Sequence, residues 1–162
     1  MSVASLKSLR QAIAAVSLLA VGFVGAAVAR DPIAPTNTEN GLAVKGYDPV
    51  AYFRVGEAVR GEAEFSATYE GATYRFASAE DRALFVASPG RYVPQYGGYC
   101  ALAMALDSIA DIDPEEWAIV GGKLYLNNGF FAQRLWSIDK SGNIERADRN
   151  WPSVPKLVVR GS

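Results

Sequence analysis

The sequence predicts an α+β fold, in which small antiparallel β-hairpins pack with short helices. Two pairs of short runs rich in aromatic and β-branched residues surround a turn, at Glu70-Gly71 and at Gly121-Gly122, a pattern typical of β-hairpins. Helix-start signals stand before and after the first pair, at Asp48-Pro49 and at Ser78. Local hairpins that alternate with short helices indicate small antiparallel sheets.

The first 29 residues have the pattern of a secretory signal peptide. Lys7 and Arg10 form a short positive region, residues 11–28 carry no charge, and Ala27-Val28-Ala29 places small residues before polar ones. We therefore expect cleavage after Ala29 by a Sec-type route and a periplasmic or secreted protein. The alternative is an uncleaved membrane anchor, because an apolar run of roughly 18 residues is long enough to span a bilayer. The small-residue motif and the following Pro32 favour cleavage.

Composition limits the function of the remaining 133 residues. They contain 14 Lys and Arg against 17 Asp and Glu, a net charge of −3, with no basic run and no second apolar span. We therefore expect a soluble protein with no nucleic-acid partner and no membrane contact after cleavage. The chain has no histidine, which excludes Ser-His-Asp and Cys-His catalytic pairs and His-ligated zinc or copper sites.

The predicted elements begin with an extended, flexible leader. Residues 30–40 are rich in Pro, Thr and Asn, and a single domain follows over residues 41–155. Asp48-Pro49 combines an acidic N-cap with Pro at the first helical position, which predicts a short helix over Val50–Phe53. Gly56 ends this helix.

A hairpin and a second helix come next. Glu64–Tyr69 and Thr73–Phe76 are the two strands, joined at Glu70-Gly71. Ser78, with Asp81 three residues later, resembles a capping box, and apolar residues at 83–87 supply the inner face of the helix.

Ser88-Pro89-Gly90 ends the second helix, and Arg91–Tyr96 forms an aromatic connector. Gly97-Gly98 interrupts the chain before Tyr99–Leu106, whose apolar residues surround the helix on all sides. That pattern predicts a buried helix.

The C-terminal part predicts a second hairpin followed by helices. Asp113–Glu116 is a capped turn, and Trp117–Val120 and Lys123–Leu126 are the strands that follow. A mixed helical pattern of apolar residues covers Asn127–Asp139, and Ile144–Asn150 predicts a short final helix that ends at the prolines beyond it.

Four sequence strings occur together in a specific order. They are Gly46-Tyr47-Asp48-Pro49-Val50-Ala51-Tyr52-Phe53, Tyr74-Arg75-Phe76-Ala77-Ser78, Pro94-Gln95-Tyr96-Gly97-Gly98-Tyr99-Cys100-Ala101 and Gly122-Lys123-Leu124-Tyr125-Leu126-Asn127. In this order the chain resembles the exported YHS-domain family of bacteria, from about Gly41 to Pro152.

The resemblance implies a small α+β domain with a hairpin-plus-helix core, related to metal-binding cysteine modules of copper pumps and metal sensors. Those relatives carry one Cys just before the helix-capping Ser and another three residues after it. Ala77 and Asp81 occupy these positions here, so the ligand pair is missing, as is the His of the family name.

The lone thiol, Cys100, supports three readings. Cys100 and Met104 lie one helical turn apart, and a thiolate with a thioether suits Cu(I), so copper is the candidate metal. Both residue types are also common in protein cores, and the apolar neighbours favour the core reading. A third, enzymatic alternative uses Cys100 as a nucleophile or redox thiol near a helix start, with Lys123 or Arg91 as the activating cation.

The tyrosines around the motif strings form a candidate ligand site. They could line an aromatic pocket for a small molecule or serve only as large, partly polar core residues. Gly97-Gly98 could present N–H groups to an anion or simply permit a tight turn, and Asp48 is a helix cap with a possible acid–base role. The candidate ligand-binding residues are Tyr47, Asp48, Tyr52, Tyr96, Gly97, Gly98 and Tyr99.

The leading prediction is a non-enzymatic periplasmic module that binds a small ligand or a soft metal near Cys100. The alternatives are a Cys100-dependent thiol enzyme or redox protein, and a structural or protein-interaction module with Cys100 buried. A small molecule, a metal or a protein is therefore the expected class of partner.

Overall fold

The hairpin around Glu70-Gly71 forms the larger of two sheets. In the computed structural model, which describes residues 32–156, β3 (Glu62–Tyr69) pairs antiparallel with β4 (Ala72–Phe76). β2 (Leu42–Ala43) joins β4 in parallel, through Leu42 and Thr73, and β1 (Thr38–Glu39) pairs antiparallel with β2. The strand order is therefore β1-β2-β4-β3.

The predicted export signal, residues 1–29, lies outside the described residues. Within residues 32–156, no helix has the length and apolar character needed to cross a membrane.

Local capping explains the helices around this sheet. The Asp48 carboxylate accepts hydrogen bonds from Val50 N, at 2.8 Å, and Ala51 N, at 3.3 Å, and α1 (Ala51–Arg54) follows. Ser78 Oγ accepts from Asp81 N at 3.1 Å and begins α2 (Ala79–Ala87). The predicted cap at Ser78 is confirmed, whereas Asp48 holds the turn that precedes α1, whose N-cap residue is Val50.

The predicted connector over residues 91–96 is partly helical. α3 (Pro89–Tyr92) begins with Pro89 in its first turn, where a missing N–H costs nothing. The connector expectation failed there because Pro89 both ends α2 and starts α3.

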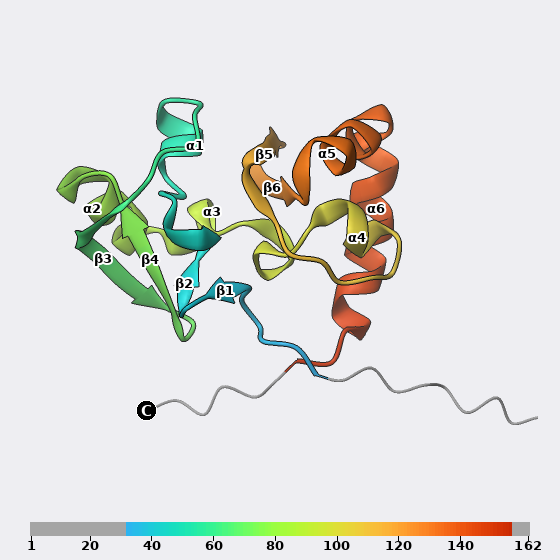
Figure 1. Ribbon diagram of the computed structural model, residues 1–162, viewed down its shortest axis with the longest axis horizontal. Coiled ribbons are helices and arrows are strands. Elements are labelled where there is room, and N and C mark those ends of the chain that lie inside the picture. The colour runs from blue at the N-terminus through green and yellow to red at the C-terminus, as the bar shows by residue number, and fades with distance from the viewer. Residues whose placement is uncertain (1–31, 157–162) are drawn as a thin grey trace, which may run out of the picture.

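The second half of the chain surrounds the second hairpin. β5 (Asp113–Val120) and β6 (Lys123–Asn127) pair antiparallel, and α4 (Ala101–Ala105), α5 (Gly129–Ile138) and α6 (Lys140–Asn150) lie beside them (Figure 1). β5 begins at Asp113, where the sequence indicated a turn. α6 begins four residues before the expected Ile144, because Asp139 Oδ1 accepts from Gly142 N at 2.9 Å and caps it. The α+β class with antiparallel hairpins is confirmed.

Two clusters of buried side chains hold these elements together. The first joins the large sheet and α2 to the second hairpin, since Phe76 and Phe85 share it with Leu124 and Leu126 of β6. The second lies among α4, α5 and α6, around Trp136. Trp136 is the buried residue of α5, whose other large apolar side chains point to solvent: Phe130, Phe131, Leu135 and Ile138.

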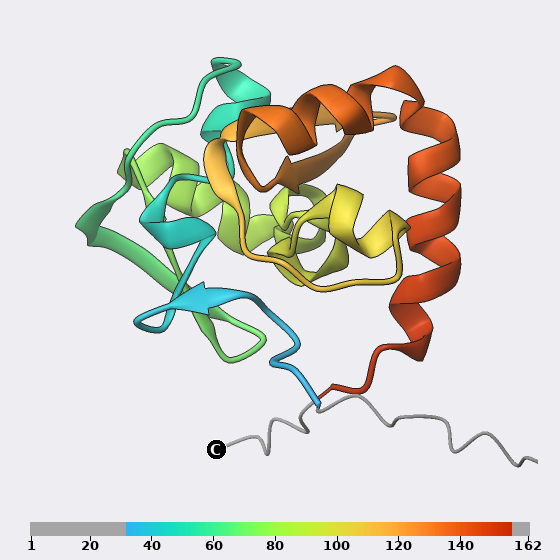
Figure 2. The same ribbon diagram turned by 45° about the vertical axis from the view of Figure 1, so that its right-hand side comes forward.

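The expected flexible leader belongs to the fold from Ile33 onward. Ile33 N donates to Pro155 O at 2.9 Å, and Asn37 N donates to Gly97 O at 2.8 Å. The two ends of the described chain therefore lie side by side, below the helices in Figure 2. A segment of low apolar content gains its order here from backbone hydrogen bonds to distant parts of the chain, which its own composition does not indicate.

Candidate functional site

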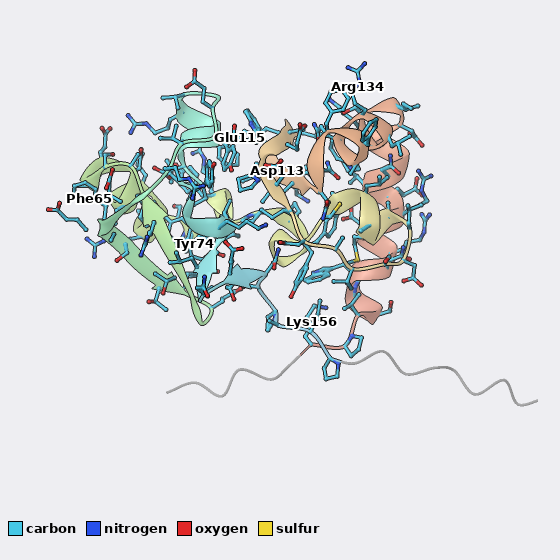
Figure 3. The ribbon with its side chains drawn as sticks, viewed as in Figure 1. Phe65, Tyr74, Asp113, Glu115, Arg134 and Lys156 are labelled. Carbon is cyan, nitrogen blue, oxygen red and sulfur yellow. The ribbon has the colours of Figure 1, made fainter. Side chains whose placement is uncertain are left out.

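An open cleft lies where the two ends of the described chain meet the turn at Tyr96-Gly97. Its volume is about 330 Å³, at the lower end of the range for small-molecule sites. We call it the terminal cleft, and Figure 3 labels two of its residues, Tyr74 and Lys156. Its lining comprises Pro35, Thr36, Glu70, Tyr74, Val93, Pro94, Gln95, Tyr96, Gly97, Trp151 and Lys156.

The turn at Tyr96-Gly97 has left-handed backbone geometry. Tyr96 has φ 55° and Gly97 has φ 60° within the short 3-10 turn Gln95–Gly98. A Cβ atom at Gly97 would lie 2.1 Å from the carbonyl oxygen of Pro35, so only glycine allows the N-terminal segment to approach this closely. The turn therefore fixes the position of Pro35 in the cleft wall.

Hydrogen bonds hold the tyrosines of the turn in place. Tyr96 OH donates to Asp148 Oδ1 at 2.9 Å, and burial together with this carboxylate raises the pKa of Tyr96 above its ordinary value. Tyr99 OH donates to Ala34 O at 3.1 Å, and its ring lies 6.3 Å from that of Trp151. Both hydroxyl groups are therefore engaged by the protein, and Tyr96 is the one of the two that lines the cleft.

Lys156 forms the cationic part of the cleft. Its Nζ lies 4.0 Å from the centre of the Trp151 ring and donates to Trp151 O at 2.9 Å and Val154 O at 3.1 Å. Burial lowers the pKa of Lys156. Among residues 32–156, no carboxylate forms an ion pair with this ammonium.

The other predicted tyrosines lie in a different place. Tyr47 OH donates to Glu115 Oε1 at 3.1 Å, and Tyr52 OH donates to Pro114 O at 3.0 Å. These contacts join α1 to the start of β5, at the opposite end of the molecule from the meeting chain ends (Figures 1 and 3). Tyr52 is buried and packs edge-on against Trp117, which makes this group part of the contact between the two halves.

Asp48 is a fully buried carboxyl group in the same region. It accepts hydrogen bonds from three backbone N–H groups, including Ala77 N at 2.8 Å. Burial is the largest influence on its pKa and, with the nearby Asp81, raises it to about 6 despite these hydrogen bonds. Arg54 forms an ion pair with Asp81 at 2.5 Å, so the pair of acids carries one compensating cation.

Cys100 acts as the N-cap of α4. Its Sγ accepts from Ala103 N at 3.5 Å and from Asn128 N at 3.3 Å, and the thiol lies 3.6 Å from Asn127 Oδ1. None of these partners is charged. Cys100 is 2% exposed, which confirms the buried reading of this residue.

Met104 is buried as well, but in the other cluster. Cys100 belongs to the cluster around the large sheet, and Met104 packs among α4, α5 and α6. Within the described part of the chain, no group of three or more His, Cys, Asp or Glu side chains is arranged to hold a metal ion. One helical turn therefore places the two sulfur atoms in separate environments.

The anion site considered at Gly97-Gly98 does not form at the following helix. α4 begins three residues later, and its first N–H groups are already bonded: Leu102 N donates to Asn127 Oδ1 at 2.9 Å, and Ala103 N donates to Cys100 Sγ. Gly98, with φ 77°, continues the turn, so the pair forms a tight turn.

Sequence reasoning identified one wall of the terminal cleft and missed the others. Tyr96 and Gly97 came from the most distinctive string, whereas Glu70 was assigned only to a hairpin turn. Trp151 and Lys156 lie beyond the last predicted helix, and no local pattern marked them. Comparison of the sequence with models of protein families gives no match, and comparisons with curated proteins and with solved structures give none either.

Proposed function

We propose that this chain is an exported, non-enzymatic binding protein of the YHS-domain type that holds a small molecule in the terminal cleft. The observation that carries the proposal is the cleft itself, about 330 Å³ in volume and lined by the aromatic residues Tyr74, Tyr96 and Trp151 among others. Concave sites with aromatic walls and a few polar groups are the usual form of small-molecule sites.

The walls are held in place by contacts within the protein. Tyr96 is fixed through Asp148, and Tyr74 is buried and hydrogen-bonded to Thr36. The left-handed turn at Gly97 fixes Pro35. A site whose walls are already ordered loses little entropy on binding, which supports a binding role.

The thiol is a weaker candidate for function than the cleft. Cys100 is buried, caps α4 and has neutral hydrogen-bond partners. A reactive thiol requires exposure and a nearby positive charge or base. A soft-metal site would require Cys100 to leave these partners.

Binding is tested by NMR titration of the ¹⁵N-labelled protein with indole, phenol, benzoate, benzylamine and cyclohexanol at millimolar concentration. We expect at least one fragment to shift the amides of Tyr96 and Gly97 and the indole of Trp151. Trp151→Leu should remove these shifts. Phe131→Leu, at an 81% exposed position on α5, is the matched control and should keep them.

Two results would contradict the proposal. One is the absence of shifts around the cleft with every fragment. The other is Cu(I) binding in the presence of a competing chelator, if Cys100→Ser abolishes this binding. That result would show that the thiol, and not the cleft, is the binding site.

A further inference from the structure

The terminal cleft contains two opposite charges that do not neutralise each other. Lys156 uses two of its three N–H groups on backbone carbonyls. Glu70 also lines the cleft, and no Lys or Arg among residues 32–156 pairs with it. The Glu70 carboxylate accepts a hydrogen bond from the Tyr69 hydroxyl, and its remaining lone pairs, like the third N–H of Lys156, are free for a ligand.

The backbone of Glu70 has a left-handed conformation that is unfavourable for a glutamate. Glu70 and Gly71 are the central residues of the β3–β4 turn, with φ 47° and 78°. Such turns favour Asn, Asp or Gly at the first central position, and other residues are strained there. A glutamate in this geometry keeps a carboxylate at the cleft wall, where a neutral Asn or Gly would be the easier choice for the turn alone.

Lys156 is held over an aromatic ring, and no carboxylate among residues 32–156 forms an ion pair with it. Burial lowers the pKa of this ammonium, since its neighbours are neutral carbonyls and the Trp151 ring. An anionic group that entered the cleft would supply the missing counter-charge, and the remaining N–H would donate to it.

Aromatic and apolar residues line the cleft together with these charges. Tyr74, Trp151 and Pro94 contribute to the lining. Aromatic rings and a proline ring favour flat or bulky apolar groups. The cleft thus combines one anion, one cation and an apolar surface.

We propose that the terminal cleft binds a free α-amino acid with an aromatic or large apolar side chain. The ligand carboxylate contacts the Lys156 ammonium, the ligand ammonium contacts the Glu70 carboxylate, and the ligand side chain lies against Tyr74 and Trp151. This inference rests on the proposed function and adds the class of ligand to it.

The test compares four ligands on the protein as the cell produces it, by NMR titration and calorimetry. L-Phenylalanine carries both charges, 2-phenylethylamine only the cation, 3-phenylpropionate only the anion, and 3-phenylpropionamide neither. We expect L-phenylalanine to bind about tenfold more tightly than either singly charged analogue, the factor that one charge-assisted hydrogen bond supplies.

Two variants separate the charges. Lys156→Met should weaken L-phenylalanine and 3-phenylpropionate about tenfold and leave 2-phenylethylamine within twofold. Glu70→Gln should have the opposite selectivity, and its side-chain carbonyl can still accept the hydrogen bond from Tyr69 at this exposed turn. Lys123→Met and Glu64→Gln, both exposed and outside the cleft lining, are the matched controls and should change nothing.

The outcomes distinguish this inference from the proposed function. If all four compounds shift Tyr96 and Gly97 with affinities within twofold, and neither variant alters them, the cleft binds small molecules but not amino acids as such. If no compound shifts these amides, and the five fragments of the earlier titration also fail, the proposed function fails together with the inference.

Discussion

Replacement of the buried Asp48 by Asn should change how stability depends on pH. Burial raises the pKa of Asp48 from its ordinary value of 3.8 to about 6. The Asp48 carboxyl group therefore binds its proton more tightly in the folded protein than in the unfolded chain. The resulting stabilisation is fully present below pH 3.8 and is lost as the pH rises through about 6.

The size of the effect follows from the two pKa values. The difference between 3.8 and about 6 corresponds to about 3 kcal/mol of unfolding free energy. Asp48→Asn cannot ionise, so it lacks this dependence. Its amide NH₂ would also face Ala77 N–H, where Oδ2 accepts at 2.8 Å, and an unsatisfied buried donor costs about 1–3 kcal/mol.

The ionisation of Asp48 and the lost hydrogen bond together determine how the stability difference between variant and wild type depends on pH. At pH 4 the variant should be less stable than the wild type by about 1–3 kcal/mol, because only the lost hydrogen bond counts there. At pH 8 the wild type carries the cost of a buried carboxylate, and the difference should vanish or reverse. The difference in unfolding free energy should thus shift by about 2.5 kcal/mol between these values of pH, slightly less than the full value of about 3 kcal/mol because the unfolded carboxyl group is already partly ionised at pH 4.

Urea unfolding followed by tryptophan fluorescence, at intervals from pH 4 to pH 8, measures this shift. Comparison of the two proteins at each pH cancels the contributions of other carboxyl groups. Asp113→Asn is the matched control: Asp113 also precedes a proline and accepts from Glu115 N at 3.0 Å, but it is only half-buried, at the start of β5. It should follow the wild type in parallel. A variant-to-wild-type difference that stays constant for Asp48→Asn would refute the reasoning.

Three further predictions concern the backbone, the thiol and the core. Gly97→Ala should lower the unfolding free energy by about 3 kcal/mol or more, because its Cβ would meet Pro35 O at 2.1 Å. The control Gly121→Ala has open space around it and should cost about 1 kcal/mol. Equal losses of the two variants in urea unfolding would contradict this prediction. Cys100 should react with iodoacetamide in proportion to the unfolded fraction, and rapid alkylation in native buffer would show that the cap opens. Trp136→Phe should lower the unfolding free energy by less than about 1.5 kcal/mol in thermal unfolding, because the buried Nε1–H of Trp136 has no hydrogen-bond acceptor among the described residues. A loss of unfolding free energy above about 4 kcal/mol would instead indicate that the indole N–H has a partner.

The elements that the sequence predicted well are those whose causes are local. Ser78 caps α2 through Asp81, three residues away, and the Glu70-Gly71 turn joins adjacent strands. Composition and spacing reveal such features because the interacting groups are neighbours in the chain. The class of fold followed from them.

The features that escaped prediction depend on distant contacts. β2 is a strand because Leu42 pairs with Thr73, and the leader is ordered because Asn37 N meets Gly97 O. Neither segment has a strong pattern of its own. The terminal cleft shares this origin, since its walls come from both ends of the described chain and from the turn between them.

The string Tyr96–Ala101 explains why the candidate site was located but its chemistry was not. We expected its tyrosines, glycines and thiol to act together. The left-handed pair Tyr96-Gly97 turns the backbone, so the first part of the string lines the cleft, and Cys100, a few residues later, enters the core as the cap of α4. A thiol protected in this way is compatible with the proposed export, because burial keeps oxidants and other thiols away from an unpaired cysteine. The string Tyr96–Ala101 thus has two structural roles: it forms the turn at the cleft and it caps α4. The residues that give the cleft its charges, Glu70 and Lys156, lie outside this string.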